Sequence, residues 1–97
     1  MNDWKEIVKN NDRYENFVIV DEPKPFKEMF KDQDISCVQT HSTTVVDENT
    51  LVGFSGAFEW KDNKIISLDG DSYSENMIVL GYEWFENEGK KGLDVLI

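Results

Sequence analysis

The fold of this chain is decided by residues 65–88, IISLDGDSYSENMIVLGYEWFENE. Two apolar runs stand on either side of a loop made of Asp, Gly, Ser and Asn, a pattern that is typical of two strands and their connection. The stretch carries six carboxylates and neither Lys nor Arg. We therefore expect it to supply central strands of a small sheet and most of the negative charge on the surface.

The stretch before it, residues 52–60, alternates between apolar and small or polar side chains. Val52, Phe54, Phe58 and Trp60 point one way in an extended chain, as a half-buried strand requires. A three-residue turn, 61–63, places Phe58 opposite Ile66 and keeps the large apolar side chains on one face. A two-residue turn would set Glu59 against Ile66 instead, because a slip of one residue inverts every side chain.

The remaining segments predict two short helices and further strands. Residues 2–11 form a helix that Asn2 or Asp3 caps, with Trp4, Ile7 and Val8 on one apolar stripe. The other expected elements are a strand at 17–20 that ends at the prolines of 21–25, a helix at 26–31, an edge or half-exposed strand at 35–46, a strand at 77–86, a loop at 87–92 and a strand at 93–97.

Together these elements predict a single α+β domain over residues 1–97. We expect an antiparallel, meander-like sheet of about five strands, with one or two short N-terminal helices packed on one face. The other face would carry Met77, Val79 and Phe85 beside Glu83 and Glu59. Such a mixed face is either covered because the sheet curls on itself, or it is a binding surface.

Composition narrows the class of partner. The chain has 97 residues and a net charge of −10, and residues 35–97 hold four bases against eleven acids. This excess argues against a nucleic acid ligand and an anionic membrane, because both need Lys and Arg. It favours a basic protein or a cation, unless the surface is acidic only in a general way. With no signal-peptide pattern and one cysteine, Cys37, we expect a cytoplasmic protein without disulfides.

The acidic loop at residues 69–76 has three possible interpretations. Asp69, Asp71 and Glu75 are spaced like the start of a calcium loop, but Ser74 and Leu80 stand where such a loop needs Gly and Glu. The second interpretation is a turn in which Asp69 and Asp71 accept hydrogen bonds from nearby backbone amides. The third is a surface loop that contacts a basic partner. We expect no metal and no cofactor here.

Catalytic patterns are weak. His41 is the single histidine and lies among hydroxyl side chains, so a base paired with Ser42 is conceivable, but nothing marks the third member of a triad. The glycines form no phosphate-binding motif, and Cys37 has no basic neighbour in sequence to activate its thiol. The expectation is a protein that is not an enzyme and has no catalytic residues.

In size, acidity and α+β pattern the chain resembles the small cytoplasmic immunity proteins of bacterial toxin systems. The resemblance implies an acidic binding protein that neutralises a basic partner, most naturally a nuclease-type toxin domain, by direct binding and as a monomer or weak dimer. Acidic side chains with aromatic anchors would form the contact. The predicted partner-binding residues are Glu59, Asp69, Asp71, Tyr73, Glu75, Glu83 and Phe85.

Two other functions remain open at this point. A nucleic-acid mimic would present its carboxylates in place of phosphates to a defence nuclease. A small-ligand binder or enzyme would use a cup lined by Phe58, Trp60, Tyr82 and Trp84 if the sheet curls. A filled core with an acidic, partly apolar outer face would favour the protein-binding function over the cup.

Overall fold

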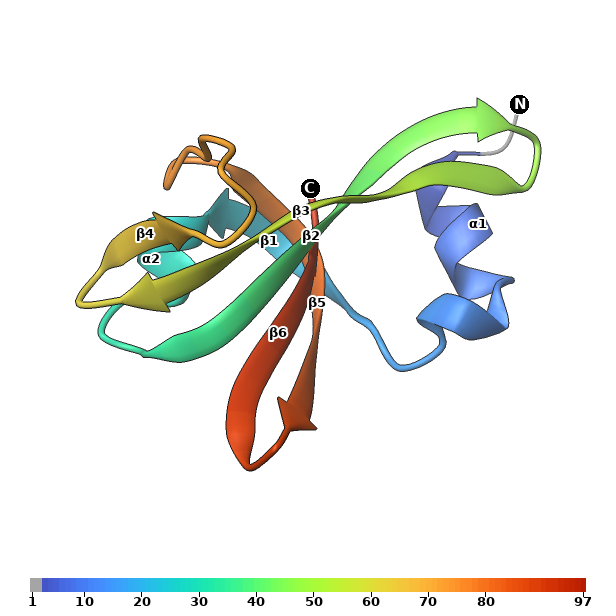
Figure 1. Cartoon of the computed structure of the whole chain (residues 1–97). Helices are drawn as coiled ribbons and strands as arrows, with labels where there is room; N and C mark the ends of the chain where they lie inside the picture. Colours follow the sequence, from blue (N-terminus) through green and yellow to red (C-terminus); the bar gives the residue numbers. More distant parts are fainter. Residues whose placement is uncertain (1–2) are drawn as a thin grey trace.

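The computed structural model describes residues 3–97 and shows six strands with short helical segments (Figure 1). The α+β class is confirmed. In chain order the elements are α1 (Trp4–Lys9), the 3-10 turn η1 (Asp12–Tyr14), β1 (Val18–Pro25), α2 (Phe26–Met29), β2 (Ile35–Asp47), β3 (Thr50–Lys61), β4 (Lys64–Ser67), β5 (Ile78–Asn87) and β6 (Lys90–Leu96).

The strands form one mixed sheet in the order β1-β5-β6-β2-β3-β4. Four of the pairings are antiparallel, but β2 and β6 run parallel, from Cys37 opposite Gly92 to His41 opposite Leu96. The expectation of a purely antiparallel meander is therefore wrong. The last strand inserts between β5 and β2, so residues far apart in sequence meet in the middle of the sheet.

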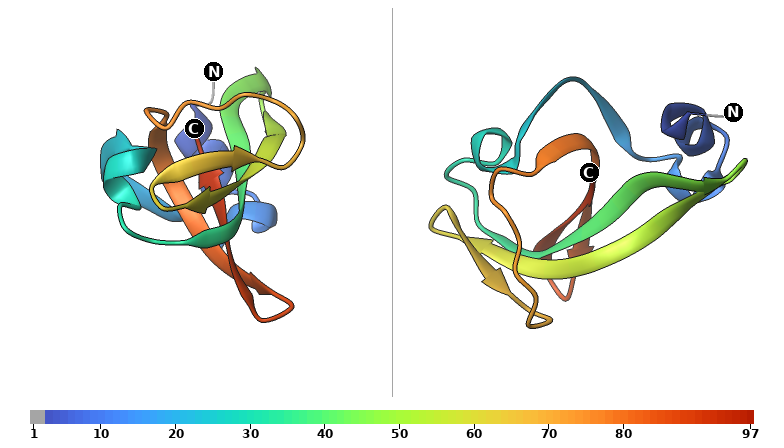
Figure 2. Two further views of the ribbon diagram at one scale, coloured as in Figure 1. Left: turned by 60° about the vertical axis from the view of Figure 1, so that its left-hand side comes forward. Right: turned by 90° about the horizontal axis from the view of Figure 1, so that it is seen from above.

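Two apolar clusters lie on opposite faces of β6. Leu93 and Val95 belong to the first cluster with Phe26 and Phe30 from α2 and its C-terminal cap, whereas Leu96 belongs to the second. Neighbouring residues of a strand point to opposite faces, so the clusters flank the sheet. The second cluster contains Ile7 and Val8 of α1, and the two helices therefore cover different faces, contrary to the expectation of one helical face (Figure 2).

In the N-terminal part of the chain, the predicted cap of α1 is confirmed, but the predicted end of β1 is wrong. Asp3 accepts a hydrogen bond from the backbone of Lys5 and caps α1, while the alternative cap Asn2 lies outside the described residues. The strand predicted to end before the prolines continues to Pro25. β1 is an edge strand, and there a residue without a backbone donor is tolerated.

The polar strand β2 is central over part of its length rather than an edge. Residues 37–41 pair with β6 on one side, and residues 38–41 pair with β3 on the other. Its buried polar groups have partners, which is what makes the position tolerable. Thr40 donates its hydroxyl to the carbonyl of Gly56 at 3.1 Å, and His41 lies 3.1 Å from the carboxylate of Asp94.

The turn between β3 and β4 has two residues, so the three-residue prediction is wrong. Glu59 lies opposite Ile66, and Trp60 lies opposite Ile65. Both turn residues have positive φ, 54° at Asp62 and 61° at Asn63, as the tight hairpin turn requires. Contacts from outside the hairpin hold this turn: Asp34 accepts from the Asp62 amide, and Asn63 exchanges two hydrogen bonds with Asp32.

Candidate functional site

The predicted partner-binding residues fall into two groups, and the first group ties the 68–77 loop to β3. The carboxylate of Asp69 accepts hydrogen bonds from the Tyr73 hydroxyl and from the Ala57 amide, and the Tyr73 oxygen also accepts from that amide at 3.0 Å. The Tyr73 ring packs on Phe58 of the first cluster, with ring centroids 5.2 Å apart. Asp69 and Tyr73 therefore hold the loop in place.

Their protonation follows from these bonds. The hydroxyl of Tyr73 and the amides of Asp71 and Ala57 stabilise the charged carboxylate and lower the pKa of Asp69 to about 2. Desolvation, followed by the neighbouring Asp69 carboxylate, raises the pKa of Tyr73 to about 12. Asp71 and Glu75 are exposed in the same loop.

The second group lies on the opposite face of the sheet from the first cluster. Two cross-strand rows run across it, and we call them together the open face. The first row is Glu83, Asp94, Gln39 and Ala57. The second row consists of Phe85, Gly92 and Cys37 and, across the shift in the β2–β3 register between Ile35 and Val38, of Glu59 and Ile66. Of these positions, Glu59, Glu83 and Phe85 were predicted as partner-binding residues from sequence.

Most side chains of the open face are half-buried. The Phe85 ring lies directly over Gly92, where a Cβ atom would overlap it. Burial, and then the nearby Asp94 carboxylate, raises the pKa of the Cys37 thiol, which makes it a poor nucleophile. The two rows contain three carboxylates, those of Glu59, Glu83 and Asp94, and no basic side chain.

Apolar and basic groups border these rows. Ile66 is 47% exposed and Leu68, beyond it, is 53% exposed. Beyond Glu59, Lys61 pairs with Lys64 at the β3–β4 turn, and Lys90 lies at the β5–β6 turn. The open face is thus acidic in the middle, apolar at the β4 side and basic at its turns.

Two members of the predicted outer face are placed elsewhere. Val79 is fully buried in the first cluster, and Met77 packs against the same cluster. β1 pairs with β5 irregularly here, passing from Ile19 opposite Gly81 to Lys24 opposite Val79. Simple alternation along β5 fails where the bulge changes the local direction of the strand. Asp94, Gln39 and Cys37 were missed as members of this face, because no sequence signal indicates the parallel β2–β6 pairing.

His41 is held by Asp94 rather than by a hydroxyl group. Its Nε2 lies 3.1 Å from the Asp94 carboxylate, and its ring packs edge-on against Phe17 and Phe54. The Ser42 hydroxyl donates to Thr44 at 2.9 Å. Within residues 3–97 the imidazole Nδ1 is buried without a hydrogen-bond partner. This geometry does not assemble the Ser42–His41 pair considered from sequence.

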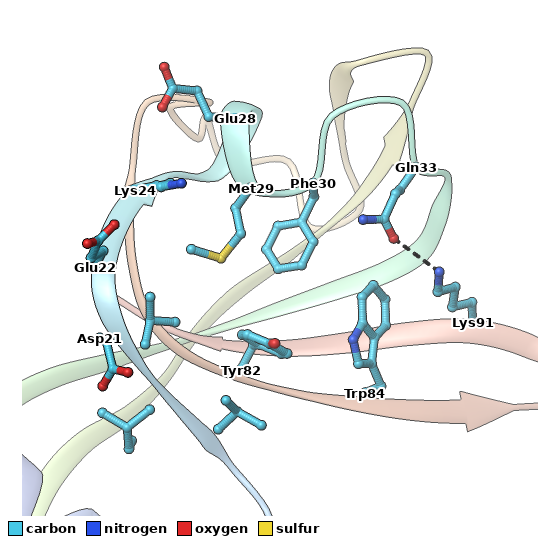
Figure 3. A pocket seen from close by; sticks show the side chains of 13 residues that line it. Asp21, Glu22, Lys24, Glu28, Met29, Phe30, Gln33, Tyr82, Trp84 and Lys91 are labelled. Atoms are coloured by element: carbon cyan, nitrogen blue, oxygen red, sulfur yellow. Dashed lines mark hydrogen bonds between the residues drawn. The ribbon is translucent and has the colours of Figure 1, made fainter.

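A groove of about 970 Å³ lies on the other side of β5, between β1 and α2 (Figure 3). Tyr82 and Trp84 line it as expected for an aromatic cup, but Phe58 and Trp60 are fully buried in the core and do not. Two of the four residues predicted for the cup therefore line the groove, and the other two belong to the core. None of the further lining residues was predicted, and these are Val18, Ile19, Val20, Asp21, Glu22, Lys24, Glu28, Met29, Phe30, Gln33 and Lys91.

Other kinds of site have little support in the part of the chain that is described. Over residues 3–97, no group of three or more His, Cys, Asp or Glu side chains is arranged to hold a metal ion. No helix in that range combines the length and the apolar character needed to cross a bilayer. Comparisons of the chain with protein-family models, with curated proteins and with solved structures found no match.

Proposed function

We propose that this chain binds a basic protein through the open face and thereby blocks that protein's activity. The observation that carries the proposal is the arrangement of Glu83, Asp94 and Glu59 around Phe85, on the face of the sheet that carries the second cluster but outside the residues that this cluster contains. The single aromatic supplies apolar area, and the carboxylates supply charge. Interfaces combine these two elements in that way.

Both the position and the number of the carboxylates favour a basic partner. A half-buried carboxylate interacts with a partner's Lys or Arg in a lower effective dielectric than a fully exposed one, so each pair contributes more. The overall charge of −10 attracts a basic partner over a longer range and speeds encounter. The basic turn residues Lys61, Lys64 and Lys90 bound the acidic centre and would fix the partner's orientation.

The exposed apolar residues next to the acids support the same function. Ile66 and Leu68 remain exposed because the two-residue turn directs them away from the core. A short edge strand with exposed apolar side chains is costly for a protein that binds nothing, since it invites association. On the open face these residues would extend the apolar contact beyond Phe85.

The biological setting that fits this chemistry is a cytoplasmic immunity protein, which neutralises a basic toxin domain by occupying it. Nuclease-type toxins are basic because their substrates are polyanions, and an acidic binding face is the matching surface. In this proposal the chain itself carries out no reaction, and its whole effect is to make the partner's site inaccessible.

The test is a titration of the chain against the product of the gene adjacent to its own, by calorimetry at low and at moderate salt. The Glu59→Lys, Glu83→Lys double variant should weaken binding at least about tenfold, since two attractive contacts become repulsive at an interface. The matched control is Glu6→Lys with Glu15→Lys, which changes the net charge equally but lies in and near the N-terminal helices.

The control distinguishes an effect of the open face on binding from an effect of the overall negative charge. If both double variants lose affinity equally, only the overall charge matters, and the open face is not the site. A third variant, Asp71→Lys with Glu75→Lys, tests the loop part of the predicted site. Loss of binding in that variant with none in the Glu59 and Glu83 variant would move the contact to the loop.

A further inference from the structure

The groove between β1 and α2 opens because β1 parts from its neighbour. Between Ile19 and Lys24, β1 advances five residues while β5 advances two, from Gly81 to Val79. The extra backbone bulges away from β5, and its residues Val20, Asp21 and Glu22 line one side of the groove. The groove has a volume of about 970 Å³, and Tyr82 and Trp84 of β5 line it (Figure 3).

Aromatic side chains form a rigid floor in this groove. Tyr82 and Trp84 stand two residues apart on β5 and thus face the same way. Both rings meet the buried Phe30 edge-on, with centroids 5.9 and 5.7 Å away. Phe30 fixes the two rings, and Trp84 is nevertheless 38% exposed. Met29 points into the space above them (Figure 3).

The two ends of the groove both favour positive charge. At one end the ammonium group of Lys91 lies 4.3 Å from the centre of the Trp84 ring and donates to Gln33 at 3.2 Å. This ring face already holds a cation. At the other end stand the carboxylates of Asp21, Glu22 and Glu28 together with the ammonium group of Lys24, so that three negative charges face one positive charge, and none of the four forms an ion pair within residues 3–97 (Figure 3).

We propose that this groove binds an extended protein segment in which basic side chains flank apolar ones. The apolar side chains would lie on Tyr82 and Met29, and one basic side chain would meet the three carboxylates. The other would take the place of Lys91 on Trp84, so that Lys91 is an internal substitute for the ligand's own cation. The groove lies on the opposite face of β5 from Glu83, and this inference is independent of the function proposed for the open face.

The probe is a blocked hexapeptide in which two leucines stand between two arginines, with glycine at each end. Its binding to the full chain is followed by the indole resonance of Trp84, assigned with Trp84→Phe. We expect saturable shifts of that resonance. The control peptide carries citrulline, which is neutral, in place of both arginines, and should bind at least several-fold more weakly. Equal binding of the two peptides would overturn recognition of the cation.

Variants of the groove sharpen the test. Lys91→Gln should tighten binding several-fold, because the ligand no longer displaces a cation from Trp84. Glu22→Gln with Glu28→Gln should weaken it by a similar factor, while Glu59→Lys with Glu83→Lys should leave it unchanged. Absence of binding even to the Lys91→Gln variant would refute the proposal, as would binding that Lys91→Gln does not strengthen.

Discussion

The imidazole of His41 and the carboxylate of Asp94 lie 3.1 Å apart, although 53 residues separate them in sequence. They meet because β6 runs parallel to β2, with Gln39 opposite Asp94 and His41 opposite Leu96. The ring is buried, whereas Asp94 is half-buried on the open face. The pair therefore joins the centre of the fold to the proposed binding surface.

Removing the Asp94 carboxylate should destabilise the fold. Asp94→Ala leaves the buried His41 ring without its partner, and an unsatisfied buried polar group costs about 1–3 kcal/mol. Glu83 lies directly opposite Asp94 on β5 and is the matched control. Glu83→Ala should change the free energy of unfolding by less than about 0.5 kcal/mol. Urea denaturation compares the two, and equal effects would contradict a structural role for the His41–Asp94 pair.

The tight turn between β3 and β4 should discriminate between alanine and glycine. Asp62 has a φ of 54°, where a Cβ atom is strained, and its amide donates to Asp34 whichever side chain it carries. Asp62→Ala should therefore be less stable than Asp62→Gly by about 1 kcal/mol. Chemical denaturation of both variants measures the difference. Alanine as stable as glycine would mean that the turn is not the two-residue form.

The contact between Gly92 and Phe85 should behave as a coupled pair. A methyl group at Gly92 overlaps the Phe85 ring, so Gly92→Ala should cost about 1–3 kcal/mol through overpacking. In the Phe85→Ala background the same change should cost little, because the ring is gone. A double-mutant cycle on the free energy of unfolding reports the coupling. Additive effects would show that Phe85 does not lie over Gly92.

The 68–77 loop should loosen at both extremes of pH. The lowered pKa of Asp69 means that its contribution is complete above the ordinary carboxyl range, near pH 4, and is lost as the pH falls through about 2. The raised pKa of Tyr73 means that its contribution is complete below about pH 10 and is lost as the pH rises through about 12. The Tyr73 ring resonances follow both transitions.

Two variants assign those transitions. Asp69→Asn should abolish the acidic transition, and Tyr73→Phe should abolish the alkaline one. Both should speed hydrogen exchange at the Ala57 amide several-fold, since that amide donates to both side chains. Transitions that persist in the variants would assign the titration to other groups.

The sequence predicted what depends on neighbours along the chain. The Asp3 cap, the apolar stripe of α1 and the shared face of Glu83 and Phe85 follow from local spacing alone. Val52, Phe54, Phe58 and Trp60 were placed on one face, but only Phe58 and Trp60 are buried in the core, whereas Val52 and Phe54 are more than half exposed. The turn after them was predicted one residue too long. The error in the turn length placed Ile66 and Leu68 on the buried face, whereas they are 47% and 53% exposed.

What the sequence could not provide depends on contacts between distant segments. The two-residue turn is held by Asp32 and Asp34, about 30 residues before it in the chain. The insertion of β6 beside β2 leaves no periodic signal, and it decides that Asp94 joins the open face. The bulge in β1 lines the groove, and it lies where the prolines led to the prediction that the strand ends. Each of these features depends on which of several possible strand pairings is the more stable, and contacts between distant segments decide that.

The central claim is that a basic partner contacts the open face. The most direct measurement is amide hydrogen exchange of the chain alone and with the product of the adjacent gene. The claim predicts added protection on β5, β6 and β3 around Glu83, Asp94 and Glu59, with that protection lost in the Glu59→Lys, Glu83→Lys variant. Protection confined to the groove side or to α1, with these strands unchanged, would contradict it.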